Sequence, residues 1–136
     1  MLEFTGFPVA ALDFYDDLEM DNTKTYWEAH KPTYDQAVAA PMKALVAALA
    51  DEFGDAKVFR PYRDVRFAKD KTPYKTHQGV WFEESRVYVQ ISAAGLFVAA
   101  GYWRTETAQI ERLRRAVDHE MHGPALVKAI AAVEKK

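Results

Sequence analysis

Residues 57–77 gather side chains that could together bind an anion. This stretch holds seven of the chain's 18 lysine and arginine residues and two acidic residues, so its net charge is +5 while the chain's is −2. Guanidinium groups match the geometry of carboxylate and phosphate, and lysines add point charge. Uncompensated positive charges held close together repel one another, which favours a bound anion. The predicted anion-binding residues are Arg60, Arg63, Arg66, Lys69, Lys71 and Lys75.

Two aspartates are predicted to organise these cations. If residues 63–67 are extended, Asp64 and Arg66 share a face of the strand and can form a charge-assisted pair. Asp70 lies in a turn-rich run, where its side chain can cap its own backbone. The alternative is a salt-bridge network, in which these aspartates and the acidic helices neutralise the stretch.

Tyr74 and His77 are the candidate acid–base pair if the site is catalytic. Histidine is the side chain most easily tuned to neutral pH. A second pair, His119 and His122, has the i, i+3 spacing that could hold a metal on a helix, but no third ligand is evident. We therefore predict surface histidines there, with no metal and no cofactor.

Several enzyme classes lack their motifs in this chain. Cysteine is absent, which excludes a thiol nucleophile, a disulfide framework and a cysteine-ligated metal. Ser85 and Ser92 are the two serines, in a predicted turn and at a strand end, which disfavours a serine triad. No Gly-rich phosphate loop and no H-E-x-x-H motif occurs. Whether the protein is an enzyme stays open.

The elements that must position these residues follow from apolar spacing and turn residues. Helical periodicity and caps predict helices over 8–20 and 23–30, the second ended or restarted by Pro32. A longer helix is predicted on to about residue 53, with a kink or split at Pro41. Two more are predicted, one from Thr105 and a last one after the break at residues 123–124. Alternating or β-branched runs predict strands over 58–59, 65–67, 78–82, 86–92 and 96–103, with turns at 83–85 and 93–95.

This order predicts one α+β domain over residues 1–136. Helices, then strands, then helices favour an antiparallel β-meander packed against N-terminal and C-terminal helices. The N-terminus lacks a basic signal-peptide region, and no apolar run reaches the roughly 20 residues that span a bilayer. We expect a cytoplasmic protein without membrane contact. The near-neutral overall charge argues against general nucleic-acid coating, although it does not exclude nucleic acid.

The run R-x-x-R-D-x-R-F-x-K-D-K-x-P-Y-K-T-H at residues 60–77 resembles the signature of domain-of-unknown-function family 2461, a set of conserved hypothetical proteins of bacteria. Further matches are Phe14, Leu18, Asn22, Tyr26, Trp27, Lys31, Tyr34, Pro41 and residues 101–103. The resemblance implies a single-domain α+β fold and supports the site, but implies no reaction. Family members usually continue past Lys136, so the resemblance implies either a short member of the family or a C-terminally truncated one.

Two functions remain open at this stage. The first is a pocket for a small ligand that carries phosphate or carboxylate, with or without catalysis. The alternative is a non-enzymatic module that docks an acidic protein or nucleic acid through the basic stretch. An enclosed basic site favours the first function, and a flat exposed one favours the second. The oligomeric state is not predicted.

Overall fold

A computed structural model describes residues 3–136, which fall into two units with the boundary after Gly101. The first unit contains three α-helices, a π-helical turn and a four-stranded sheet, and the second contains two helices. The helices are α1 Val9–Met20, α2 Lys24–Tyr34, the π-helical turn η1 Asp35–Ala39, α3 Ala40–Phe53, α4 Thr107–Val117 and α5 His122–Glu134. The strands are β1 Ala56–Val58, β2 His77–Phe82, β3 Val87–Ser92 and β4 Gly95–Ala100.

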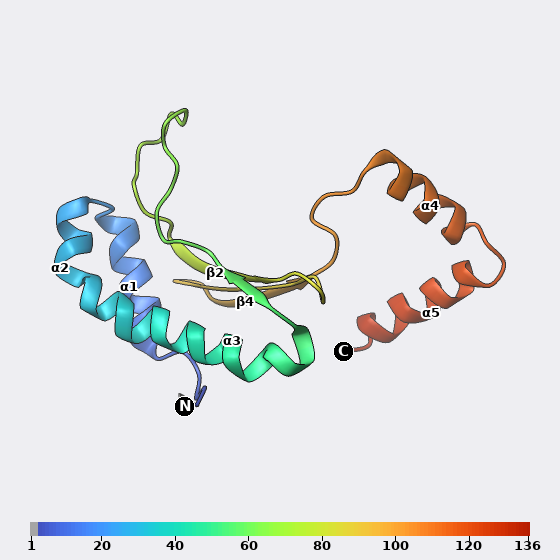
Figure 1. Cartoon of the computed structure of the whole chain (residues 1–136), viewed down its shortest axis with the longest axis horizontal. Coiled ribbons are helices and arrows are strands. Elements are labelled where there is room, and N and C mark those ends of the chain that lie inside the picture. Colours follow the sequence, from blue (N-terminus) through green and yellow to red (C-terminus); the bar gives the residue numbers. More distant parts are fainter. Residues whose placement is uncertain (1–2) are drawn as a thin grey trace. The chain divides into compact units, whose positions relative to one another are not determined.

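The sheet confirms the predicted antiparallel meander and the α+β class. Its strand order is β1-β2-β3-β4, and every neighbouring pair is antiparallel. Alternate residues of the central strands point to one face and are buried, among them Val80, Phe82, Val89 and Ile91. Within the first unit, α1 and α3 contact the sheet and lie on one side of it (Figure 1). Residues of the opposite face therefore lie outside the main core.

The helix through Pro32 differs from the prediction. The sequence predicts that Pro32 ends the helix or restarts it, yet α2 runs through Pro32 without interruption to Tyr34. Proline removes one intrahelical hydrogen bond. Trp27 and Tyr34 lie on the same face of α2, two turns apart. Both side chains are buried, and their ring centroids are 4.8 Å apart. This aromatic packing on one face of α2 offsets the lost bond.

The predicted break near Pro41 is confirmed, and it takes the form of the π-helical turn η1. There the backbone N–H of Ala40 donates to the carbonyl of Asp35, five residues earlier. Pro41 has no N–H to continue the α-helical ladder, but it fits the first turn of a new helix. The chain therefore changes register just before Pro41 and starts α3.

The strand predicted over residues 65–67 is wrong, because these residues form a turn. A strand needs a partner for its backbone, and here the carbonyl of Val65 instead accepts a hydrogen bond from Lys71 Nζ at 2.8 Å. The cap predicted at Thr105 is also displaced by one residue. Glu106 is the N-cap of α4, and it forms a capping box with Gln109.

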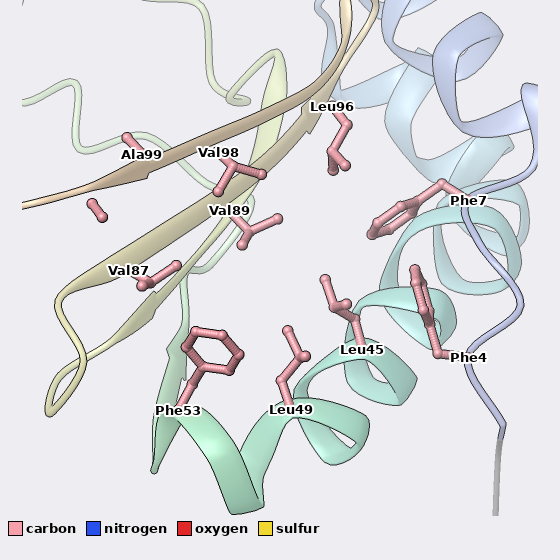
Figure 2. Close-up of a pocket in the computed structure, with 11 residues that line it drawn as sticks. Phe4, Phe7, Leu45, Leu49, Phe53, Val87, Val89, Leu96, Val98 and Ala99 are labelled. Carbon is pink, nitrogen blue, oxygen red and sulfur yellow. The ribbon is translucent and has the colours of Figure 1, made fainter. Parts of the chain in front are cut away.

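An apolar hollow of about 500 Å³ lies between the sheet, α3 and the N-terminal segment (Figure 2). Its lining is Phe4, Phe7, Leu45, Leu49, Phe53, Val87, Val89, Leu96, Val98, Ala99 and Ala100. None of these side chains can donate a proton or carry a charge. This hollow is therefore not the predicted anion site. Among residues 3–136, no helix has the length and apolar character required to cross a membrane.

Candidate functional site

The connection between β1 and β2 carries the predicted site and stands off the sheet as a long loop (Figure 1). Its two arms meet at a β-bridge between Tyr62 and Tyr74. On either side of the bridge, Arg63 N donates to Pro73 O at 2.9 Å and Lys75 N donates to Pro61 O at 2.8 Å. These bonds divide the loop into a base near the sheet and a tip beyond the bridge.

Asn22, at the break between α1 and α2, ties the loop to the helices. Its Nδ2 donates to the carbonyl of Tyr74 at 2.9 Å, and its Oδ1 accepts from the Tyr74 N–H at 3.1 Å. The Tyr74 ring stacks on Trp27 of α2, with centroids 4.4 Å apart and planes 8° apart. The loop is thus held by one amide and one aromatic stack.

Replacing Asn22 with alanine should reduce the free energy of unfolding by about 1–3 kcal/mol, because the Tyr74 backbone would lose both partners. The Tyr74 amide should also lose hydrogen-exchange protection relative to β3. The control is Lys24→Ala, since the Lys24 side chain is exposed and forms a 3.6 Å ion pair with Glu28. Equal effects of the two changes would contradict the anchoring role of Asn22.

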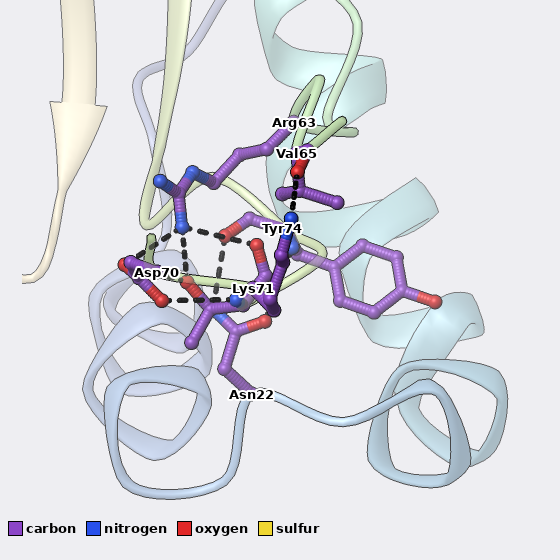
Figure 3. Close-up of polar contacts among 7 residues, drawn as sticks. Asn22, Arg63, Val65, Asp70, Lys71 and Tyr74 are labelled. Atoms are coloured by element: carbon purple, nitrogen blue, oxygen red, sulfur yellow. Dashed lines mark hydrogen bonds and ion pairs between the residues drawn. The ribbon is translucent and has the colours of Figure 1, made fainter. Parts of the chain in front are cut away.

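At the loop tip, Arg63 is held by Asp70 and Thr72 (Figure 3). Arg63 Nη1 lies 2.8 Å from Asp70 Oδ2 and 3.0 Å from the Thr72 carbonyl, and it also donates to the Thr72 hydroxyl. Asp70 caps its own turn as predicted, because Thr72 N donates to Asp70 Oδ1 at 2.9 Å. Hydrogen bonds from Thr72, and then from Arg63, hold the pKa of the Asp70 carboxyl below its usual range.

The predicted pairing of Asp64 with Arg66 is present, although in a turn rather than in a strand. Arg66 Nε and Nη2 donate to the two carboxylate oxygens at 2.9 and 2.7 Å. These bonds lower the pKa of Asp64. Lys71 closes the tip through its bond to Val65 O. At the tip, Arg63, Arg66 and Lys71 therefore satisfy groups of the loop itself, as the salt-bridge network predicts, and Lys69 is exposed.

The loop base holds a second group of cations, arranged around Phe59. Lys57 Nζ and Lys75 Nζ lie 5.7 and 5.6 Å from the centroid of the Phe59 ring. Arg60 lies close enough to Lys75 to lower its pKa, an effect that comes second to burial. Within residues 3–136, no carboxylate forms an ion pair with Lys57 or Lys75. Arg60 forms no ion pair in this range either, but its charge, after the hydrogen bonds from Arg66, helps to lower the pKa of Asp64, so it is partly compensated. The two lysines therefore keep unpaired positive charge at the base of the loop.

His77 and Tyr74 lie in different surroundings. Burial first, and then the charge of Lys75, lower the pKa of His77. His77 begins β2 two residues before Gly79, which pairs with Phe59, so His77 and Phe59 share a face of the sheet. Tyr74 is buried in the aromatic core, and its ring points away from the Arg63 contacts (Figure 3). No hydrogen bond joins the two side chains in the described chain. The structure groups His77, but not Tyr74, with the unpaired cations, and the acid–base role stays a prediction.

A buried glutamine, Gln78, positions Phe59, although it is not among the residues predicted for the site. Gln78 Nε2 donates to the Phe59 carbonyl at 2.6 Å, and Gln78 Oε1 accepts from the Tyr34 hydroxyl at 2.6 Å. Gln78 is 2% exposed. Period-two alternation in β2 assigns Gln78 to the core face. A polar residue at a core position needs a buried hydrogen-bond partner, and this could have marked Gln78 in the sequence. The same alternation places Lys57 and Phe59 on one face of their strand.

The histidines of the second unit do not form a metal site within the described residues. His119 Nδ1 accepts a hydrogen bond from the Met121 N–H at 3.1 Å, and the rings of His119 and His122 are 4.7 Å apart. No group of three or more histidine, aspartate or glutamate residues between positions 3 and 136 is placed to hold an ion.

Comparison with known proteins matches one family and no characterised relative. No curated protein matches the chain, and no solved structure does. A family model described as "Conserved hypothetical protein (DUF2461)" matches residues 10–136, which include the helices, the sheet and the loop described above. The chain therefore belongs to the DUF2461 family of conserved hypothetical proteins.

Proposed function

We propose that this protein binds a phosphate- or carboxylate-bearing ligand at the base of the β1–β2 loop. The observation that carries the proposal is that Lys57 and Lys75 converge on Phe59 near Arg60, while no described carboxylate forms an ion pair with either lysine. Like charges held together raise the free energy of the empty site, and an anion removes that repulsion. Of the six cations predicted from the sequence, Arg60 and Lys75 keep this role, and Lys57 joins them.

The loop tip has a supporting role in this proposal. Arg63, Arg66 and Lys71 already donate to oxygens of the loop, so an anion would have to compete with those bonds. Asp64 and Asp70 organise the tip, and the tip in turn orders the arm that carries Lys75. The proposal covers binding and not catalysis, because Tyr74, one of the two predicted acid–base residues, lies in the core. Localisation in the bacterial cytoplasm is part of the same proposal.

Titration with pyrophosphate at low ionic strength tests the site. The double variant Lys57→Gln/Lys75→Gln should bind at least about a hundredfold more weakly, because it removes two charge-assisted contacts of about 1.5–3 kcal/mol each. Each single variant, Lys57→Gln or Lys75→Gln, is also compared with Lys69→Gln, a matched control that neutralises one exposed lysine of the tip. An equal loss in the single variants and this control would mean that the basic stretch acts only through its overall charge. Absence of binding by the unaltered chain would refute the proposal.

The pKa of His77 should rise when pyrophosphate binds. In the free protein, burial and Lys75 lower it from 6.5, so protonation favours the unfolded chain and stability falls as pH drops below about 6.5. A bound anion would favour the protonated ring and reduce this loss. NMR titration of the histidine ring protons measures the shift, with His119 of the second unit as the internal control. An unchanged His77 pKa would place the anion elsewhere.

A further inference from the structure

The face of the sheet opposite the main core carries a row of aromatic rings. Phe59, Tyr88 and Phe97 come from the end of β1, from β3 and from β4, and successive ring centroids are 6.4 Å apart. Phe97 is 54% exposed. Trp81 lies on the same face, where its Nε1 donates to Glu83 at 2.6 Å. The row therefore crosses the sheet and ends at the Phe59 ring beside Lys57 and Lys75.

Gly79 makes this row possible. It lies in β2 between the strands that carry Phe59 and Tyr88, and a Cβ at this position would be 2.5 Å from the Tyr88 hydroxyl and 2.9 Å from Cε2. The Tyr88 ring thus lies flat over a strand that has no side chain there. Tyr88 also donates to Gln90 Oε1 at 2.7 Å, which fixes the ring's orientation.

We propose that this face binds single-stranded nucleic acid, with bases stacked on the aromatic row and the backbone phosphates held by Lys57, Arg60 and Lys75. The inference rests on the proposed anion site and extends it to one class of ligand. Aromatic rings beside a cationic patch are the two components of single-strand binding, because every base has a face that can stack. A four-stranded sheet that displays two or three such rings is a known platform for unpaired bases.

The charge distribution agrees with this occupant. The cations lie at the β1 end of the row, where phosphates would run, and the central rings carry no charge. An acidic peptide would also meet the cations, but it would leave Tyr88 and Phe97 without a partner. Binding to the bases therefore separates nucleic acid from other polyanions.

Fluorescence anisotropy with a labelled oligothymidylate of roughly 12 nucleotides tests the inference, since single-strand sites span about 4–16 nucleotides per domain. The matched ligand is an abasic strand with the same number of phosphates. The inference expects tight binding of the oligothymidylate, weaker binding of the abasic strand, and affinity that falls with salt. Phe97→Ala should weaken binding of the oligothymidylate by about 5- to 150-fold and leave binding of the abasic strand unchanged.

Two further variants keep the test decisive. Gly79→Ala should displace the Tyr88 ring and weaken binding, and circular dichroism would show whether the sheet remains. Phe67→Ala is the control, because this phenyl ring is 96% exposed at the loop tip and lies outside the row. Equal binding of both strands would overturn the inference while leaving the anion site intact. An acidic peptide that binds as tightly as the oligothymidylate would overturn it too, and binding of no polyanion would overturn both proposals.

Discussion

Replacing Trp27 with alanine should lower the free energy of unfolding by about 3–5 kcal/mol, the usual cost of deleting a buried tryptophan. Trp27 is 3% exposed and contacts the rings of Phe14 at 5.8 Å, Tyr34 at 4.8 Å and Tyr74 at 4.4 Å. It therefore joins α1, the end of α2 and the loop in one cluster. Its removal would leave a cavity among rings that come from three separate segments.

Urea unfolding followed by far-ultraviolet circular dichroism measures this effect without relying on tryptophan emission. The matched control is Trp103→Ala, because Trp103 is 85% exposed and should cost no more than about 0.5 kcal/mol. Similar midpoints for the two variants would mean that the cluster around Trp27 does not contribute to cooperative unfolding. A loss confined to Trp27→Ala would agree with the stack seen between α2 and Tyr74.

Replacing Gln78 with leucine should destabilise the protein by about 1–3 kcal/mol for each buried group left without its partner. The Tyr34 hydroxyl and the Phe59 carbonyl would both lose a 2.6 Å hydrogen bond. Because Phe59 lies between the sheet and the cations, the same change should also weaken pyrophosphate binding. The two readouts are chemical denaturation and titration with pyrophosphate.

A double-mutant cycle with Tyr34→Phe separates this bond from the rest of the effect. The double variant should cost less than the sum of the single changes, since removal of both partners leaves neither one unsatisfied. Strictly additive costs would show that the Tyr34–Gln78 bond is not coupled. Burial also raises the pKa of Tyr34 to about 12, so the hydroxyl stays a donor throughout the neutral range.

The order of elements could be predicted because each signal lies within a few residues. The Thr23 cap, the strand alternation of residues 87–91 and the break near Pro41 all depend on neighbours along the chain. The structure differs from the predicted helix boundary at Pro32 and from the strand predicted over residues 65–67, because side-chain contacts beyond the immediate neighbours decide both. Aromatic packing continues the helix past Pro32, and Lys71 takes the carbonyl of Val65.

At the candidate site too, local interactions could be predicted and contacts with more remote residues could not. Asp64 and Arg66, two residues apart, form the predicted pair, and Asp70 caps the turn predicted for it. The sequence predicted the six cations as one anion-binding group. In the structure, Arg63 instead donates to groups seven and nine residues away, and Lys71 donates to a carbonyl six residues away. Which charges remain available depends on that loop geometry. Asn22 and Gln78 were missed as anchors because their partners lie 52 residues away and up to 44 residues away, respectively.

The sequence by itself determined that positive charge would gather in residues 57–77 and that two aspartates there would order local turns. Charge density and turn chemistry are properties of short segments. Only the tertiary structure decided that Lys57 and Lys75 lie beside the Phe59 ring without an ion-pair partner among the described residues, and that Tyr88 lies over Gly79. Strand register and core packing create those neighbours, and they depend on many contacts between distant residues rather than on any local pattern.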